Sequence, residues 1–431
     1  MWHDAYRAYV ERHLRFYFEV PEGLQFHYGQ PEQEGSAALR IPDRGRSFFN
    51  GEAGAQPDFE VVDGLPLLFK EPDTPLLQKT EGGWRITADL IAGIFYFMSG
   101  WQEYNRGDRF YHTDSWQGRH GFEKQPLADQ YFELLAGALA KCYQTAIPRK
   151  KWHGPGAAVT LSHDIDKLYG GRLEGSFNEL KKGRFLKALK GLTGRRDPWF
   201  NLSAIGQIEK KLGVRATFFM LPRQGSHPQG KNADYHYADP AVQKEVAALR
   251  QAGSEIALHG SLGTHVNARE FERDRAALKE KVRGNRFHFL HFNRQHTPEL
   301  LEKAGMEYDA TLGFPDVIGF RNGMARPYKL FNFERNHISE TLEIPLHIMD
   351  TSLQHPKYMG LKPSAALEAM QALFEVSRAQ QGTLSVLWHN NYFSDYKYQG
   401  WSAVYRDFIT SLPAETAFYT AGELAQIYRA L

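Results

Sequence analysis

From residue 157 onward, short runs of β-forming apolar residues alternate with segments whose apolar residues recur at helical spacing. The strands that this pattern predicts are residues 157–161, 214–220, 254–258, 284–290, 342–346 and 384–388. The predicted helices are residues 201–212, 239–252, 298–304 and 364–379. Repeated β-α-β units give parallel strands joined by right-handed crossovers. The alternation therefore restricts this part of the chain to an α/β fold, either an open sheet or a barrel.

A segment rich in proline, glycine and basic residues, residues 147–156, interrupts the regular patterns before that region begins. The residues before it contain two predicted helices, at 89–99 and 127–143, and many aromatic side chains. A chain of 431 residues is long enough for two or three domains. We therefore predict a smaller N-terminal α/β domain over residues 1–150 and a larger α/β domain over residues 151–431.

Composition and charge exclude several classes of protein. Lys and Arg number 52 and Asp and Glu number 50, so the formal charge of +2 gives no general reason to expect nucleic acid as a partner. A single cysteine, Cys142, cannot form a disulfide within the chain. The first twenty residues carry several charges, and the longest apolar run, residues 90–98, is far shorter than the ~20 residues that cross a membrane. We therefore expect a soluble, cytoplasmic protein.

Ionisable side chains follow the predicted strands at the points where those strands end. Asp164 and Asp166 come just after the first strand. His259 and His389 end later strands, and Arg286 lies on or beside another. In α/β barrels the loops after the strands converge on one mouth, where catalytic residues collect. These five side chains are therefore expected to meet at one site.

The two carboxylates of this set suggest a metal. Asp164 and Asp166 are two positions apart, which places both side chains on the same side of an extended segment. Two close carboxylates repel each other unless a cation or an arginine lies between them. Asp and His ligands that leave one coordination position open are typical of hydrolytic zinc sites, where the metal lowers the pKa of water. The residues alone leave two interpretations open: such a metal site, or carboxylates that cap the next segment and pair with Lys167.

Five short motifs together resemble a known family. They are residues 162–166 (SHDID), 216–219 (ATFF), 253–259 (GSEIALH), 286–289 (RFHF) and 386–389 (VLWH). Their order and spacing make residues 157–395 similar to the polysaccharide deacetylase (NodB-homology) family, whose fold is a distorted (β/α) barrel. The N-terminal part of the chain, with residues 95–104 (FYFMSGWQEY), resembles an uncharacterised domain that precedes the barrel in one branch of that family.

The resemblance implies a role for each ionisable residue at the strand ends. Asp164 corresponds to the general base, and Asp166 to the aspartate that binds the metal. His259 corresponds to the first metal histidine, and Arg286 to the arginine that holds the base carboxylate. His389 corresponds to the general acid. The implied cofactor is a divalent metal ion, zinc above all, with cobalt or nickel as alternatives.

The sequence departs from the family at one metal ligand. The family supplies a second histidine four residues after the first, where this chain has Gly263. Two residues are candidates to replace it: His265 in the same loop, and His288, where the family commonly has proline. Each has an alternative interpretation, a surface loop histidine for His265 and a packed barrel histidine for His288. With neither as a ligand, two protein groups would hold the metal and its affinity would be poor. The resemblance also places an oxyanion donor at the backbone amide of His288 or Phe289.

The function implied by the resemblance is that of a metal-dependent hydrolase. Its substrate would be an N- or O-acetylated sugar, glycan or glycolipid, from which it removes acetyl groups in surface-polysaccharide biosynthesis. Two other functions stay open: hydrolysis of a small cyclic amide or ureide, and a catalytically silent glycan-binding module that has lost its second metal histidine.

Residues 172–196 form a basic, amphipathic segment, with eight Lys and Arg residues against two Glu residues. A solvated insertion on the barrel would explain this pattern. The alternative is a surface for an anionic substrate or for peripheral contact with a membrane.

Overall fold

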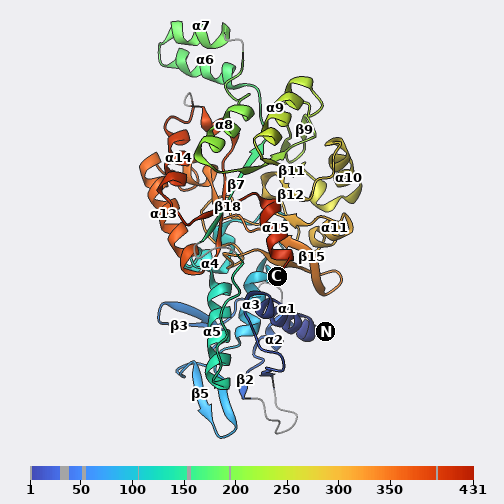
Figure 1. The fold of residues 1–431 in the computed structure, drawn as a ribbon, viewed down its shortest axis with the longest axis vertical. Helices are drawn as coiled ribbons and strands as arrows, with labels where there is room; N and C mark the ends of the chain where they lie inside the picture. Colours follow the sequence, from blue (N-terminus) through green and yellow to red (C-terminus); the bar gives the residue numbers. More distant parts are fainter. Residues whose placement is uncertain are drawn as a thin grey trace.

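The structure is a computed structural model of the chain. It describes residues 2–29, 38–50, 55–104, 106–152, 157–193, 196–394 and 397–431. Residues 153–156 of the expected boundary segment and Arg195 of the basic segment lie outside the described residues. The molecule is elongated, with a large sheet and its helices in the middle, the N-terminal region at one end and a helical hairpin at the other (Figure 1).

One large sheet organises the chain from residue 158 onward. Its strands are β7 (Ala158–Ile165), β8 (Ala216–Met220), β11 (Glu255–Gly260), β12 (Gly284–Phe287), β13 (Tyr308–Asp309), β14 (Tyr328–Asn332), β15 (His337–Glu343), β16 (Ile348–Met349), β17 (Thr383–Leu387) and β18 (Ala417–Tyr419). Their order is β14-β15-β13-β12-β11-β8-β7-β17-β16, with β18 beside the first half of β7. The pairings are parallel except for that of β14 with β15. In the described strands β14 and β16 do not pair with each other, so the sheet stays open on one side.

Helices cover the outside of this sheet (Figure 1). They are α8 (Leu202–Leu212), α9 (Pro240–Gln251), α10 (Ala268–Ala277), α11 (Thr297–Lys303), α13 (Pro363–Ala379), α14 (Trp401–Ser411) and α15 (Ala421–Arg429). Local signals explain some of their ends. The Asp239 carboxylate accepts a hydrogen bond from the Ala241 amide at the start of α9, and Gly213, with φ of +73°, ends α8. The four helices predicted for this region are confirmed, each to within one residue at either end.

The strand predicted at 284–290 is too long. It stops at Phe287 because Phe289 and Leu290 have φ values of +57° and +56°. This left-handed conformation cannot continue a strand and costs free energy in a residue with a side chain. The chain turns sharply here, directly after the end of β12.

Two other strands differ from their predicted positions. β7 continues past residue 161 to Ile165, so Asp164 belongs to the strand itself. The strand predicted at 342–346 lies earlier, at β15, where it pairs with the antiparallel strand β14. The periodicity did not predict β14.

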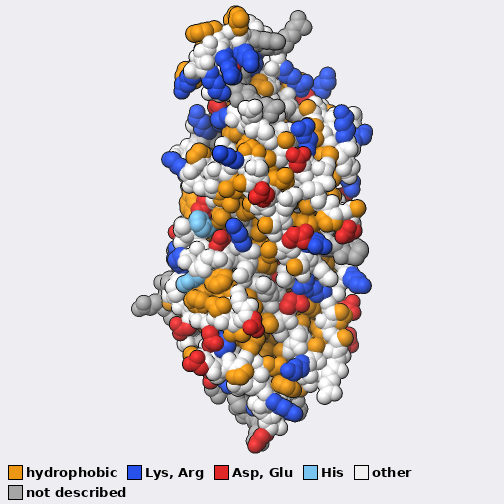
Figure 2. All heavy atoms as spheres, turned by 90° about the vertical axis from the view of Figure 1, so that its left-hand side faces the viewer, with side chains coloured by type: hydrophobic (Ala, Val, Ile, Leu, Met, Phe, Trp, Pro, Cys, Tyr) orange, Lys and Arg blue, Asp and Glu red, His pale blue; other side chains and the backbone are white. Residues whose placement is uncertain are grey.

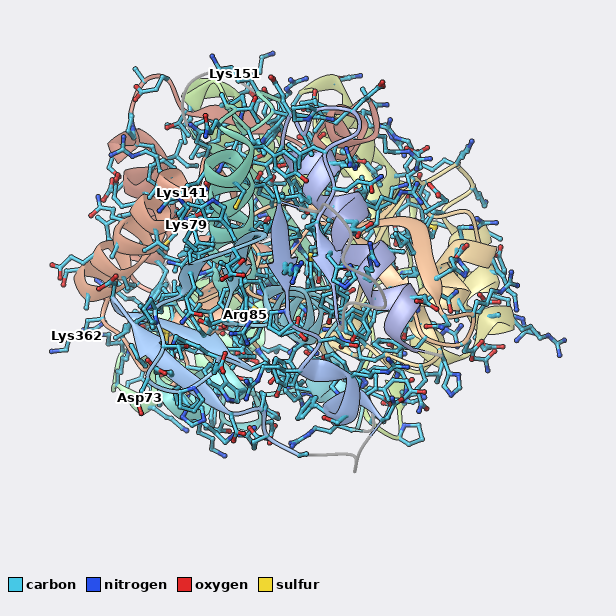
Figure 3. All side chains as sticks on the ribbon, turned by 90° about the horizontal axis from the view of Figure 1, so that it is seen from below. Asp73, Lys79, Arg85, Lys141, Lys151 and Lys362 are labelled. Carbon is cyan, nitrogen blue, oxygen red and sulfur yellow. The ribbon has the colours of Figure 1, made fainter. Side chains whose placement is uncertain are left out.

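The N-terminal region contains helices and small sheets, as expected for α/β structure. Its helices are α1 (Trp2–Tyr17), α2 (Gly45–Phe49), α3 (Leu90–Met98), α4 (Trp116–His120) and α5 (Leu127–Tyr143). Its strands are β1 (His27–Tyr28), β2 (Leu39–Ile41), β3 (Phe59–Val62), β4 (Leu65–Leu68), β5 (Leu77–Thr80) and β6 (Gly83–Ile86). Figure 3 views the molecule from this end, where Lys79, Arg85 and Lys141 project from β5, β6 and α5. Lys141 lies over the ring of Trp84, 4.7 Å from its centroid.

The N-terminal region shares a hydrophobic core with the large sheet. Phe95 of α3 packs against Phe331 of β14, with ring centroids 5.0 Å apart, and one buried apolar cluster includes residues of both regions. A buried ion cluster adds to this contact. Glu103 accepts two hydrogen bonds from Arg294 and two from Arg321, at 2.7–3.0 Å. Burial alone would raise the pKa of Glu103, but the two guanidinium groups lower it to about 2.

A helical hairpin, α6 (Gly171–Lys181) and α7 (Phe185–Thr193), protrudes beyond the other helices (Figure 1). Its base is fixed by Asp197, whose carboxylate accepts hydrogen bonds from the amides of Gly170, Gly171 and Arg172. In the described part of the chain, no helix is both long enough and apolar enough to cross a membrane.

Candidate active site

Three side chains meet where β7, β11 and β12 end. Asp166 directly follows β7, His259 lies near the end of β11, and His288 directly follows β12. His259 Nε2 is 3.3 Å from Asp166 Oδ1 and 3.1 Å from His288 Nδ1. His288 Nδ1 is 3.4 Å from Asp166 Oδ1. One carboxylate and two imidazoles therefore converge on one point, and we call these three residues the triad.

The hydrogen bonds of the two imidazoles leave a lone pair on each nitrogen that faces this point. His259 Nδ1 is 2.8 Å from the carbonyl oxygen of Arg286, and His288 Nε2 is 2.9 Å from the carbonyl oxygen of Lys231. Because a carbonyl oxygen only accepts hydrogen bonds, these two nitrogens carry the protons. His259 Nε2 and His288 Nδ1 then face each other with lone pairs, an arrangement that a cation stabilises. Carbonyl acceptors of this kind are typical outer partners of metal-binding histidines.

The spacing of the triad fits a divalent ion such as zinc. Four tetrahedral ligands at about 2.0–2.1 Å from an ion lie about 3.3–3.4 Å from one another, close to the three distances within the triad. Asp166 Oδ1 is buried and has no hydrogen-bond partner among the described residues. An unpartnered carboxylate oxygen is costly in the interior unless a cation compensates it. One carboxylate and two imidazoles suit zinc, cobalt or nickel and leave a coordination position for water or substrate.

Asp164 lies beside the triad and is held by an arginine. Arg286 Nη1 donates to Asp164 Oδ1 and to Ser162 Oγ, both at 2.9 Å, and Arg286 Nε donates to the carbonyl oxygen of Ala310 at 2.7 Å. The other carboxylate oxygen, Asp164 Oδ2, faces the triad at 3.6 Å from His259 Nε2. Burial would raise the pKa of Asp164, but His259 and Arg286 hold it below its ordinary value. The carboxylate is therefore ionised and able to accept a proton.

His389 lies on another side of the triad, two residues after β17 ends. Its Nε2 is 3.7 Å from Asp166 Oδ2. Asp350 fixes the ring, because its carboxylate lies 2.8 Å from His389 Nδ1 and accepts a hydrogen bond from the His389 amide. Burial alone would lower the pKa of His389, but Asp350 and the site carboxylates raise it to about 10. The imidazole is therefore protonated and able to donate a proton from Nε2.

The triad opens into a cavity of about 300 Å³. Its lining includes Asp164, Asp166, His288, His389, Arg109 and Tyr358. Arg109 belongs to the N-terminal region and lies over the rings of Tyr111 and Phe289, at 5.2 and 5.8 Å from their centroids. Both regions of the chain therefore contribute to the walls of this cavity.

Of the residues expected at the site, six lie together around this cavity: Asp164, Asp166, His259, Arg286, His288 and His389. His265 does not join them. β11 continues through Gly260, so the loop turns too late to bring His265 back toward the triad. His265 Nε2 instead lies 3.0 Å from Asp108 Oδ2. With 1% exposure His265 is not a surface residue either, which corrects both expectations for it.

Two charged residues of the site, Asp350 and Arg109, were not foreseen from the sequence. Asp350 follows β16, a strand of two residues that is too short to give a periodic signal. The available signal was weak: a carboxylate directly after the apolar pair Ile348 and Met349. Arg109 comes from a loop of the N-terminal region. Nothing in the sequence around it indicates that it lies at the ends of the strands of the large sheet.

The fold and site thus describe an α/β protein with a candidate metal triad at the ends of parallel strands. A family model described as a family of unknown function (DUF7033) matches residues 11–144. No curated protein matches the chain.

Several solved structures are similar at low identity. A putative polysaccharide deacetylase from Mycobacterium smegmatis is 20% identical, with 64% of this chain and 90% of that chain covered and a TM-score of 0.43. PuuE allantoinase is 14% identical, with 64% and 92% covered and a TM-score of 0.43. A probable polysaccharide deacetylase from Pseudomonas aeruginosa PAO1 is 12% identical, with 64% and 92% covered and a TM-score of 0.41. At these values, a function for this chain has to be inferred from the site itself.

Proposed function

We propose that this protein is a metal-dependent hydrolase that removes acetyl groups from an N- or O-acetylated sugar or glycan. The observation that carries the proposal is the triad with an ionised carboxylate, Asp164, and a protonated imidazole, His389, beside it. A metal site, a base and an acid are the groups that metal-dependent hydrolysis of an acyl bond uses. Residues 151–431 would supply the catalytic groups, and residues 1–150 would complete the cavity through Arg109.

In this proposal Asp166, His259 and His288 hold a divalent ion, with zinc favoured over cobalt or nickel. Such an ion, when bound, lowers the pKa of water and polarises a carbonyl oxygen. The protein residues around it select and orient the substrate. The backbone amide of His288 or Phe289 is the proposed donor to the developing oxyanion, since the left-handed turn at Phe289 bends the chain at the cavity wall.

Asp164 is the proposed general base. Arg286 holds one of its carboxylate oxygens, which leaves Oδ2 toward the triad to take the proton of the attacking water. His389 is the proposed general acid. Asp350 holds its Nδ1, so the Nε2 proton can pass to the departing nitrogen or oxygen as the bond to the acetyl carbon breaks. Acetate and a free amine or hydroxyl are the products.

Acetate release from N-acetylated oligosaccharides, measured with metal-loaded protein, tests this proposal. We expect activity in the wild-type chain and a loss of about 10²–10⁴-fold in Asp164→Asn, which keeps the shape of the base but cannot accept the proton. Wild-type protein that binds metal stoichiometrically but releases no acetate from N- or O-acetylated sugars would contradict it.

A second candidate is hydrolysis of a small cyclic amide or ureide by the same groups. The cavity volume of about 300 Å³ favours it, because this is at the lower end of the range for ligand sites and suits a small substrate. Turnover of a cyclic ureide without acetate release from sugars would support this candidate over the first. Sugar binding without turnover of either substrate would instead indicate a silent binding module.

We also infer that the hairpin α6–α7 contacts an anionic lipid surface, which would bring a glycolipid substrate to the site. Eight of the thirteen large, exposed apolar side chains of the described residues lie in or just before the hairpin: Tyr169, Leu173, Phe177, Leu180, Phe185, Leu186, Leu189 and Leu192. Phe185 and Leu186 are 70% and 85% exposed. On the face drawn in Figure 2, hydrophobic side chains lie beside Lys and Arg side chains at this end of the molecule.

The side chains on the hairpin surface are more typical of a surface that contacts lipid than of one that contacts only water. Exposed apolar side chains flanked by basic residues are typical of segments that lie in the interface of an anionic membrane. Lys181 lies over the ring of Phe177, 4.6 Å from its centroid, so a cation and an apolar ring share this surface. The hairpin begins at Gly171, only five residues after Asp166 of the triad, and is therefore rooted near the site.

A further inference from the structure

A second group of metal-binding side chains lies between the two regions of the chain. Asp108 comes from the N-terminal region, His265 from the 3-10 turn η3 (Thr264–Val266) after β11, and His291 from the loop after β12. One ligand atom of each residue lies within 4.8 Å of those of the other two. We propose that these three side chains form a second site for a divalent metal ion of the zinc, cobalt or nickel type, separate from the triad.

Burial of unpartnered nitrogens supports this site. His265 is 1% exposed and His291 is 6% exposed. Both ring nitrogens of His265 and Nδ1 of His291 are buried without a hydrogen-bond partner among the described residues. Buried polar atoms nearly always have a partner, so three unpartnered nitrogens in one place require an explanation. Coordination of a cation by one nitrogen of each imidazole accounts for two of the three, because imidazole nitrogens with free lone pairs are good ligands for these metals.

An ion pair between Asp108 and His265 alone explains fewer of these observations than a bound cation does. His265 Nε2 is 3.0 Å from Asp108 Oδ2, yet the two groups lack the alignment of a hydrogen bond. Ligands of one ion direct their lone pairs at the ion and not at each other. Their ligand atoms therefore lie a short distance apart without the alignment of a hydrogen bond. An ion pair also gives no role to His291, whose ring stands at 88° to that of His265, with centroids 5.3 Å apart.

Neighbouring hydrogen bonds hold the ligands in place. Asp108 Oδ1 accepts a hydrogen bond from Asn293 Nδ2 at 3.0 Å, and the Asp108 carbonyl oxygen accepts one from the Phe292 amide at 2.9 Å. Thr297 Oγ1 donates to the carbonyl oxygen of His265 at 2.9 Å. Partners of this kind orient metal ligands before the ion binds.

An ion at this site would fix one wall of the cavity without touching a substrate. His291 is three residues from His288 of the triad, and Phe289 and Leu290 between them line the cavity. Arg109, the neighbour of Asp108, also lines it. The second ion would therefore join the N-terminal region to the loop after β12 and position cavity residues from both sides.

Metal content distinguishes this site from the triad. The chain is stripped with a chelator, reloaded with Zn²⁺ and freed of loose metal by gel filtration before zinc is measured. We expect two zinc ions in wild type, one in His291→Gln, one in His288→Gln and none in the double variant. His296→Gln is the matched control, because it changes an exposed histidine of the same loop, 2.6 Å from Glu334, and should keep both ions. One zinc ion in wild type that remains in His291→Gln would overturn the second site, whatever the catalytic activity.

Thermal unfolding provides a second readout, with Asp108→Asn as a less buried change in case His291→Gln does not fold. A ligand that binds only the native state raises its Tm. In the His288→Gln background, Zn²⁺ should raise the Tm, and this rise should disappear when Asp108→Asn or His291→Gln is added. A rise of equal size in those double variants would contradict the site.

Discussion

The imidazole of His288 lies 3.1 Å from that of His259, across two neighbouring strands of the sheet. The family resemblance would place this second histidine four residues after His259, where the chain has Gly263. The neighbouring strand β12 supplies the imidazole instead, at the first residue after its end. The proposed metal site therefore keeps a third candidate ligand although the expected histidine is absent.

His288 and His265 should contribute differently to activity. His288→Ala removes a proposed ligand of the triad, and we expect it to lower metal affinity at the triad and kcat/KM by about 100-fold or more, since loss of even an outer partner costs about 10–100-fold. His265→Ala should lower kcat/KM by about tenfold at most, because the proposed second site positions cavity residues but His265 does not touch the triad. Steady-state kinetics at fixed free zinc checks this. Equal losses in the two variants would contradict the difference in their roles.

Arg286 should determine the pH below which kcat/KM falls, which is the acid limb of the pH profile. His259 and the Arg286 guanidinium both lower the pKa of Asp164, so Arg286→Gln should raise that pKa and leave the base protonated at pH values where the wild type is active. The acid limb of kcat/KM then moves to higher pH. Arg286→Lys keeps a positive charge and should move it less. An acid limb at the same pH in all three proteins would show that Asp164 is not the group that titrates there.

Asp350 should determine the pH above which kcat falls, which is the alkaline limb of the pH profile. Together with the carboxylates of Asp166 and Asp164, it raises the pKa of His389 to about 10, and Asp350→Asn removes the negative charge that contributes most. The pKa of His389 should fall, and because the acid must be protonated, activity should be lost at lower pH than in wild type. The alkaline limb of kcat against pH measures this. An unchanged alkaline limb, with metal content intact, would exclude His389 as the acid.

The sequence was sufficient for the parts of the fold that depend on local patterns. Helix ends such as Gly213 and Asp239 follow from glycine and capping preferences. Parallel strands bring their ends together, and this alone was enough to group Asp164, His259 and His389. The positions of residues at the end of a strand, or directly after it, were therefore predictable from the sequence.

Contacts between distant segments were not predictable in the same way. The outcome for His265 depended on where β11 ends, and a difference of a few residues moved the side chain from the triad to Asp108. Arg109 reaches the cavity through packing of the N-terminal region, and Asp350 reaches His389 from the end of a strand of two residues. Neither leaves a periodic signal, because tertiary packing and not local pattern fixes their positions.

Glu103 should make the stability of the chain depend on pH in the acid range. Its pKa is about 2 in the folded chain against an ordinary value of 4.5, so its contribution is fully present above pH 4.5 and is lost as the pH falls toward 2. The difference in the free energy of unfolding between wild type and Glu103→Gln should therefore narrow by up to about 3 kcal/mol over this range. Denaturant unfolding at several pH values checks it. A difference in the free energy of unfolding that does not change with pH would mean that the two arginines do not stabilise the ionised form of Glu103.

Vesicle binding tests the hairpin α6–α7. Wild-type protein should sediment with vesicles that contain anionic lipid and much less with neutral vesicles, and added salt should weaken this binding. Replacing Phe185, Leu186 and Leu189 with serine should abolish sedimentation. Val61→Ser, at an exposed apolar position of β3, is the matched control and should bind as wild type does. Sedimentation of the triple variant at the wild-type level would exclude the hairpin as the lipid-binding surface.

Anomalous X-ray diffraction from zinc-loaded crystals, recorded on both sides of the zinc absorption edge, locates a bound ion directly. We predict a peak at about 2.0–2.1 Å from Asp166 Oδ1, His259 Nε2 and His288 Nδ1, with a fourth position open to the cavity. Fully loaded crystals with no peak between these three atoms would contradict the metal-dependent mechanism.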